Sequence, residues 1–180
     1  MTNLKGQLVI SAGGLFDSNF RQSVVLIGAH DARGAVGVIL NRPLDVTVHD
    51  AIPTLASLVR SGDALHEGGP VETDQAVVLV EAVADALLDV RVFGSVGFVT
   101  GDVPLEVSTA VRRARVFLGH AGWGPDQLED ELAAGAWFAE PALVEDVFTA
   151  EPRTLWRRLL ERKGPLFAAA ARIPFDPRVN

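Results

Sequence analysis

The sequence predicts an α+β fold with its helices concentrated in the C-terminal third. Two observations lead to this prediction. The first half of the chain contains short β-branched runs separated by glycine-rich turns, and the last third contains proline-initiated segments with apolar residues at helical spacing. Strands that come first and helices that follow favour α+β over regular alternation. With 180 residues, no internal repeat and no low-complexity linker, residues 1–180 are expected to form a single domain.

Short apolar runs predict four strands in the first half of the chain. They are bounded by turn sequences such as Gly68-Gly69-Pro70, and they span Gln7–Ala12, Ser23–Ile27, Ala35–Leu40 and Ala76–Val80. Continuous runs such as VVLI indicate that both faces of the sheet are covered. Further along, Arg91–Thr100 and Arg115–Leu118 are each expected to form one more strand.

Two helices are expected between these strands. The first covers Val48–Val59, with Thr47 as its N-cap, and Pro53 is expected to delay its start. The second runs from Pro104 to Arg113 and begins at an Asp102 cap, with its cationic end at the helix C-terminus.

The last third is expected to be mainly helical. Helices should begin near Pro125, Pro141 and Pro152, because proline suits the first helical position. Gly164 should end the last of them. The tail from Ala171 onward is expected to be extended, because its prolines exclude a helix.

Composition limits the functions that the chain can have. There is no cysteine, which excludes disulfides, thiolate metal sites and cysteine nucleophiles. No apolar run approaches the length of a membrane span, and the N-terminus lacks a secretory apolar segment, so we expect a cytoplasmic protein. The motifs of nucleotide-binding loops, serine hydrolases and zinc proteases are missing, and no two histidines have helical ligand spacing. We therefore predict no cofactor, no metal and no catalytic residue.

The segment Gly119–Glu131 is the first candidate site. It joins an expected strand to an expected helix through a glycine-rich turn that carries Trp123. One interpretation is a pocket lined by His120, Trp123 and Gln127. The favoured one is a core tryptophan beside a helix whose acidic first turns already satisfy the helix dipole.

Two other turns carry candidate binding groups. Gly68 and Gly69 allow backbone conformations that other residues resist, and Glu67 beside them is either a surface acid or a general base. Asn41 and Arg42 end an apolar strand. Arg42 is suited to clamp the carboxylate of a ligand, or to form an internal ion pair with Glu67, which is the favoured interpretation.

Basic residues line one side of the last expected helix. They are Arg153, Arg157, Arg158, Arg162 and Lys163. A solvated helix face is the favoured interpretation, and DNA contact is the alternative. The net charge of −7 disfavours DNA binding because it repels phosphates.

The motifs together resemble one family. They are Asn41-Arg42-Pro43, Glu67 to Val71, Gly119 to Pro125, Gln127 to Glu131 and an early Phe-Asp followed by Phe20 to Val24, and in combination they are similar to the bacterial YqgE/AlgH family. The resemblance implies a bifurcated mixed β-sheet, or pseudo-barrel, flanked by helices. It also implies a bacterial cytoplasmic protein with a transcriptional-regulator label and no established catalytic residues. The chain departs from the family pattern at His120, where tyrosine is usual, and at Asp126, where glycine is common.

The favoured function is a non-catalytic binding or regulatory domain. It would take a protein partner or a small ligand at a cleft formed by Asn41, Arg42, Glu67, Gly68, Gly69, His120, Trp123 and Gln127. The first alternative is an enzyme, such as a hydrolase, with Glu67 or His120 as base and Arg42 as clamp. The second is DNA binding through the last helix. The sequence leaves the oligomeric state open.

Overall fold

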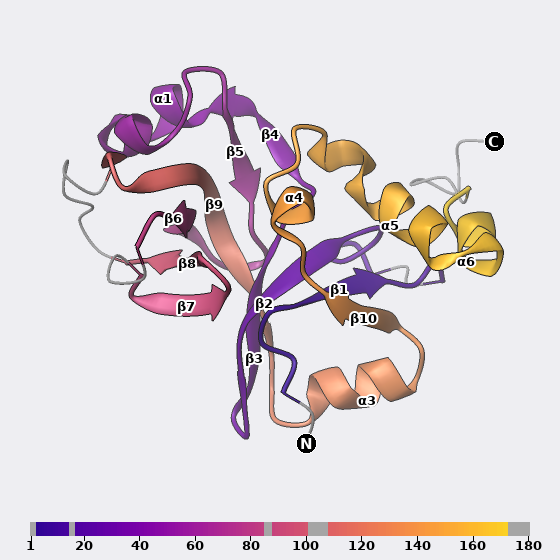
Figure 1. Cartoon of the computed structure of the whole chain (residues 1–180). Coiled ribbons are helices and arrows are strands. Elements are labelled where there is room, and N and C mark those ends of the chain that lie inside the picture. Colours follow the sequence, from indigo (N-terminus) through magenta and orange to yellow (C-terminus); the bar gives the residue numbers. More distant parts are fainter. Residues whose placement is uncertain (1–2, 15–16, 85–87, 101–107, 173–180) are drawn as a thin grey trace.

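The computed structural model describes residues 3–14, 17–84, 88–100 and 108–172 and confirms the α+β class (Figure 1). The strands are β1 (Gln7–Ser11), β2 (Val24–Asp31), β3 (Gly34–Ile39), β4 (Pro43–Thr47), β5 (Ala64–Glu67), β6 (Val71–Ala82), β7 (Val90–Phe93), β8 (Val96–Val99), β9 (Val111–Trp123) and β10 (Trp137–Pro141). The helices are α1 (Val48–Ala51), η1 (Pro53–Leu58), α3 (Gln127–Ala133), α4 (Val144–Val147), η3 (Pro152–Thr154), α5 (Leu155–Lys163) and α6 (Pro165–Ala170). Most of the helices follow the last long strand, as expected.

The strands form one sheet that forks at β9. Its main path is β10-β1-β2-β3-β9-β6-β8-β7, with antiparallel neighbours. One edge of β9 pairs with β6. The other edge pairs with β3 near Trp123 and, earlier along the strand, with β5 in parallel, where His66 lies beside Phe117. β4 then pairs with β5 and completes the second branch. The sheet is therefore bifurcated and mixed, and its described path is open rather than closed into a barrel.

Two glycines let the backbones approach closely at the fork. The Gly68 N–H donates to the Leu118 carbonyl at 2.7 Å, and its own carbonyl accepts from Ile39 at 2.9 Å, so Gly68 joins β9 to β3. A Cβ at Gly68 would lie 2.2 Å from the Gly119 oxygen, and a Cβ at Gly69 (φ +150°) would lie 2.2 Å from the His120 carbonyl. Only glycine fits such contacts. The fold therefore requires these residues, and their role in ligand binding stays a prediction.

Both faces of the central strands are buried, as the continuous apolar runs predicted. Leu8 and Leu26 pack on one face with the apolar side of α5, where the Trp156 indole donates to the Ser11 carbonyl at 2.9 Å. Val9 packs on the other face with the tryptophans that flank α3. Figure 1 shows α5 and α3 against different parts of the sheet. Each fully buried apolar side chain contributes roughly 1.5–3 kcal/mol.

Two predicted elements are divided in the structure. The helix expected over Val48–Val59 is α1, with its Thr47 cap confirmed, followed by the 3₁₀ turn η1. Pro53 separates them because it has no N–H to continue the first helix. The single strand expected over Arg91–Thr100 was wrong. It is the β7–β8 hairpin, and Gly94 at φ +48° lies in its turn.

Strand pairing also makes β9 longer than predicted, so that it replaces the end of an expected helix and an expected turn. Residues Val111–Arg113, expected to end a helix, belong to β9, and the start of that predicted helix lies outside the described residues. The strand also continues through the glycine-rich segment to Trp123, because β6 and β3 hold it on either edge. α3 begins at Gln127, two residues after Pro125, near which a helix start was expected. The helix start expected at Pro141 was wrong, because Pro141 ends β10 and α4 begins at Val144.

The sequence did not predict β4, β5 or α6. Ala171 and Arg172 form a turn, and the rest of the tail expected to be extended lies outside the described residues. None of the helices in the described part of the chain is long and apolar enough to cross a membrane.

Candidate functional site

The second branch of the sheet brings Arg42 and Glu67 together. Their side chains form an ion pair of 3.2 Å, which confirms the favoured interpretation of these residues. The Glu67 N–H also donates to the Arg42 carbonyl at 2.9 Å, and the Arg42 guanidinium reaches the Arg21 carbonyl at 3.3 Å. Asn41 lies beside them. Its side chain accepts from the Val24 N–H and donates to the Gln22 carbonyl, each at 2.8 Å, and so ties β2 to the end of β3.

Trp123 lies in the core, as favoured from the sequence. Its side chain is in contact with Phe20 and Trp137, with ring centroids 5.7 and 5.8 Å away, and only 6% of the residue is exposed. The Glu131 carboxylate accepts from both indoles, at 2.9 Å from Trp123 and 2.7 Å from Trp137. Gln127 donates to the same carboxylate at 2.8 Å. These polar groups are already satisfied within the protein, so a ligand role for Trp123 and Gln127 stays a prediction.

The backbone of His120 adjoins Gly69, but among the described residues the His120 side chain forms no ion pair with Arg42 or Glu67. It is on β9 beside Val71, and its nearest acid is Glu72 at 3.8 Å. The hypothesis of a hydrolase needs Arg42, Glu67 and His120 to act on a common point. The structure instead pairs Arg42 with Glu67 and places Glu72 nearest to His120. The described contacts therefore do not assemble a catalytic group from these three residues.

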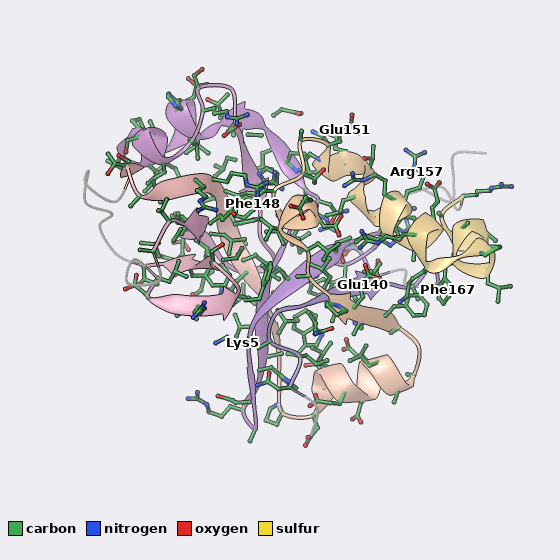
Figure 2. The ribbon with its side chains drawn as sticks, viewed as in Figure 1. Lys5, Glu140, Phe148, Glu151, Arg157 and Phe167 are labelled. Atoms are coloured by element: carbon green, nitrogen blue, oxygen red, sulfur yellow. The ribbon has the colours of Figure 1, made fainter. Side chains whose placement is uncertain are left out.

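A cavity of about 770 Å³ opens beside the ion pair, and we call it the Arg42 groove. Asn41, Arg42 and Glu67 line it together with further basic residues that come from the loop before β2 and from the region of α5, namely Arg21, Arg153 and Arg157. Figure 2 shows Arg157 on the helix at this side of the molecule. Glu67 is the one acidic residue in the described lining, so the groove is strongly cationic.

A larger cavity of about 980 Å³ adjoins the first, and we call it the His66 cavity. It lies between β9, the turn after η1 and the segment before α5, and Arg153 lines both cavities. Its charged residues are Arg60, Arg112, Arg113, Arg115, Arg153, Asp63 and Glu151. Five arginines therefore face two carboxylates in a chain whose net charge is −7. The sequence did not predict this cavity.

His66 lines this cavity and carries a buried acceptor atom without a partner among the described residues. Its Nδ1 lies 3.0 Å from the Ala64 carbonyl, and Nε2 is buried without a partner among the described residues. Burial and the positive charge of Arg115 lower the pKa of His66 to about 4 from its ordinary 6.5. The ring is therefore neutral at physiological pH. Its proton is on Nδ1, where it donates to Ala64, and Nε2 carries a free lone pair.

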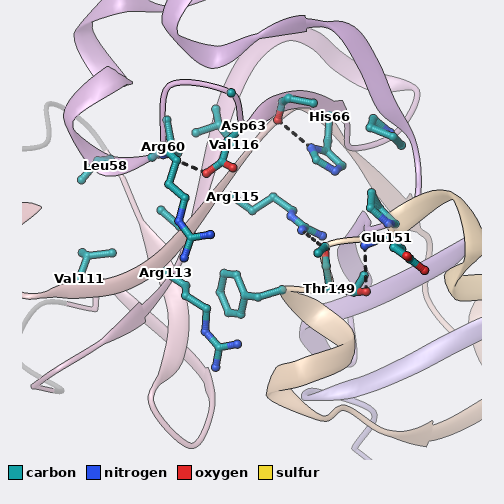
Figure 3. A pocket seen from close by; sticks show the side chains of 18 of the residues that line it. Leu58, Arg60, Asp63, His66, Val111, Arg113, Arg115, Val116, Thr149 and Glu151 are labelled. Carbon is teal, nitrogen blue, oxygen red and sulfur yellow. Dashed lines mark hydrogen bonds between the residues drawn. The ribbon is translucent and has the colours of Figure 1, made fainter.

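Arg115 is a partly buried cation without an ion pair to any described carboxylate. Its guanidinium donates to two carbonyls, Val147 at 3.0 Å and Thr149 at 2.7 Å, and so joins β9 to the segment that follows α4 (Figure 3). Burial lowers its pKa to about 10, while the charge of Asp63 opposes that effect. Arg115 therefore keeps its charge at neutral pH, and two carbonyl dipoles together with the nearby charge of Asp63 stabilise it.

The basic side of the last helix is largely engaged within the protein. Arg153 contacts Asp45 at 3.2 Å, and Arg158 donates to Thr149 at 3.0 Å. Arg162 contacts both Glu140 and Asp146, at 2.6 and 2.8 Å, and Lys163 lies 3.7 Å from Glu140. Arg157 is exposed at the Arg42 groove. The arginines of this face are exposed, as the favoured interpretation of a solvated helix face expected, and most of them also hold contacts within the protein.

Histidine and carboxylate side chains do not gather into a metal site in the part of the chain that the structure describes. Within residues 3–14, 17–84, 88–100 and 108–172, no group of three or more of them is placed to hold a metal ion.

The fold and its cavities define an α+β domain with an open, forked sheet and two adjoining arginine-lined cavities. The AlgH-like family model, DUF179, matches residues 8–168, and the chain belongs to this family. The resemblance found in the sequence motifs is thus confirmed.

Bacterial relatives cover almost the whole chain. UPF0301 proteins of Streptomyces avermitilis and Thermobifida fusca are both 38% identical to it, over 100% and 99% of this chain and 97% and 96% of their own. The crystal structure of a protein from Corynebacterium diphtheriae superposes with a TM-score of 0.85 at 29% identity, covering 95% of this chain and 93% of that one. The solution structure of AlgH from Pseudomonas aeruginosa superposes with a TM-score of 0.73 at 28% identity, covering 91% of this chain and 90% of that one. The family is one of uncharacterised proteins, and its relatives' names specify no activity.

Proposed function

We propose that this chain is a non-catalytic binding domain that recognises an acidic segment of a protein partner in the Arg42 groove. One observation carries the proposal. Four arginines and a single glutamate line the described part of this groove, although acids outnumber bases by 23 to 16 in the whole chain. A cationic concavity on an acidic protein attracts anionic partners and repels basic ones.

The Arg42–Glu67 pair supports the proposal that a partner carboxylate binds here. Arg42 already binds one carboxylate at 3.2 Å while its side chain is only 16% exposed, so its position is fixed before any partner binds. Arg157 lines the same groove and is exposed. Arginine forks match carboxylates in a bidentate manner. A partner carboxylate would therefore contact the guanidinium of Arg42, whose position is fixed, and that of Arg157, which is free to adjust.

The family's transcriptional-regulator label fits this proposal better than it fits DNA binding by the chain itself. A net charge of −7 opposes approach to a phosphate backbone, and most bases of the last helix hold internal contacts. We infer a regulatory role through a protein, in the cytoplasm.

Binding of a fluorescent hexaglutamate peptide tests the proposal. Anisotropy at low salt should report binding that weakens at least tenfold in Arg157→Glu, since charge-assisted contacts contribute about 1.5–3 kcal/mol. Arg33→Glu is the matched control, because Arg33 is 91% exposed on the β2–β3 hairpin and the net charge changes equally. Equal weakening by both variants would mean that only net charge matters, and the groove would lose its role. A labelled DNA duplex should show no shift at the same salt concentration, and a shift would favour the DNA alternative.

A further inference from the structure

The His66 cavity combines two chemical features that the Arg42 groove lacks. It contains a partly buried guanidinium that forms no direct ion pair with a described carboxylate, and it contains a buried acceptor atom without a donor among the described residues. Arg115 supplies the first and His66, at 4% exposure, supplies the second. A buried polar atom without a hydrogen-bond partner destabilises the folded protein, and a ligand that supplies the partner removes this cost. The two residues come from neighbouring strands of the fork, and both line this cavity.

Further cationic groups reach into this cavity from two elements. Figure 3 shows Arg60 extending from the turn after η1 and Arg113 from β9, with Arg115 between them and His66. The Arg60 side chain has no ion pair with any described residue, while its backbone N–H donates to Asp63 at 2.9 Å. Arg113 gives its Nε–H to Glu81 at 2.7 Å and lies 5.3 Å from the centre of the Phe148 ring. Its terminal N–H groups remain available to a ligand.

Opposing charges and apolar walls define the ligand further. Asp63 and Glu151 also line the cavity, so a weak or diffuse anion gains little there. A phosphoryl group carries close to two negative charges at neutral pH and accepts several hydrogen bonds, which suits a cluster of guanidinium groups. The volume of about 980 Å³ exceeds that of one phosphate and lies at the upper end of small-molecule sites. Leu58 and Val111 provide apolar wall for an organic part.

We propose that the His66 cavity binds the phosphoryl group of a small phosphorylated compound. Arg60, Arg113 and Arg115 hold the phosphoryl oxygens, and His66 Nε2 accepts a hydrogen bond from a hydroxyl group of the same ligand. A protonated phosphate oxygen can make the same hydrogen bond, so free phosphate shares this chemistry. The site is separate from the Arg42–Glu67 pair, and neither proposal depends on the other.

Ribose 5-phosphate is the probe for this site, and inorganic phosphate and ribose are its comparators. Calorimetric titration of the whole chain should give saturable binding of ribose 5-phosphate and none of ribose. Comparable affinity for inorganic phosphate would support the phosphoryl site and identify the free anion as its ligand. Tighter binding of the sugar phosphate would support the organic ligand. If neither anion binds at low salt, the proposal is overturned.

Variants localise the binding. Arg60→Gln should weaken binding at least tenfold, and because its side chain holds no described ion pair, the fold should persist. Arg33→Gln is the control for loss of an exposed arginine. The ring resonances of His66 should move on titration with the phosphate, which a site elsewhere would not cause. Unchanged affinity in Arg60→Gln together with stationary His66 resonances would refute the assignment.

The Arg157→Glu variant separates this proposal from the proposed function. It should reduce hexaglutamate binding and leave the affinity for ribose 5-phosphate within about twofold. Equal loss of both ligands in Arg157→Glu would show that one diffuse basic surface is being measured, and the phosphoryl site would fail as a distinct site.

Discussion

Acidification should destabilise this fold through His66. The pKa of His66 is about 4 in the folded chain, because of burial and the charge of Arg115, against an ordinary 6.5. Above pH 6.5 the ring is neutral in both states and contributes no difference. As the pH falls toward 4, the unfolded chain takes up the proton first, so the free energy of unfolding decreases and then levels off. At about 1.4 kcal/mol for each pH unit of the difference, the loss is about 3 kcal/mol.

Urea unfolding followed by tryptophan fluorescence measures this loss. Other groups titrate in the same range, so the useful quantity is the difference between the native chain and His66→Gln, whose side chain stays neutral at every pH. The free energy of unfolding of the native chain should fall by about 3 kcal/mol relative to the variant between pH 7.5 and pH 4. Phosphate-free buffers are needed, because a bound anion would raise the pKa of His66.

A pH-independent difference between the two proteins would refute the reasoning. It would mean that His66 is solvated, or that a counter-ion neutralises Arg115. Titration of the His66 ring by NMR gives an independent reading, since an apparent pKa near 6.5 would contradict the burial and charge arguments together.

Two further predictions concern the fork and the tryptophan cluster. Gly69→Ala would place a Cβ 2.2 Å from the His120 carbonyl and should cost about 3 kcal/mol or more in urea unfolding, whereas Gly62→Ala, with open space around it, should stay within about 0.5 kcal/mol. Equal costs for the two glycine variants would contradict the close approach of backbones at the fork. Both indoles donate to the same Glu131 oxygen and Gln127 donates to the other, so in Glu131→Gln the new NH₂ group must face either the indole donors or the Gln127 donor, and the free energy of unfolding should fall by about 1–3 kcal/mol, with a changed near-ultraviolet dichroism. The exposed Asp130→Asn on the same helix should change neither quantity, and an equal effect there would mean that the shared carboxylate does not stabilise the indoles.

The sequence predicted those elements whose formation is decided locally. Apolar runs predicted β1, β2 and β3, and the leucine and tryptophan stripe predicted α5. β4 and β5 were missed because their pattern is short and partly polar, and pairing across the fork is what makes them strands. Likewise β9 continues through Gly119, at φ +72°, because neighbours on both edges hold a segment that local preference would end.

The same distinction explains what could be predicted of the candidate sites. Opposite charges on two turns were enough to predict the Arg42–Glu67 pair, and the family motifs placed those turns in a common context. The phosphoryl-site proposal rests on the burial of His66 and Arg115, which comes from the pairing of β5 with β9 and from the contacts of Arg115 with Val147 and Thr149. One local feature was available: Arg113 and Arg115 alternate along an extended run, which puts both side chains on one face of a strand. The sequence pattern instead favoured Arg113 as the basic end of a helix.

The placement of arginine argues that the two cavities have a binding role beyond keeping the chain in solution. The chain has fourteen arginines and two lysines, and eight of the arginines line the two cavities together with three carboxylates. Glu81 and Asp45, outside the lining, pair with Arg113 and Arg153. Solubility alone would be served by charges dispersed over the surface, and lysine would serve equally well. Several arginines gathered in a concavity lose hydration and repel one another, which costs free energy. In return, each planar guanidinium can donate two hydrogen bonds to the oxygens of a carboxylate or phosphoryl group. Because Arg153 lines both cavities, the two sites share one electrostatic field, and the Arg33 and Arg157 variants are needed to tell specific recognition apart from that field.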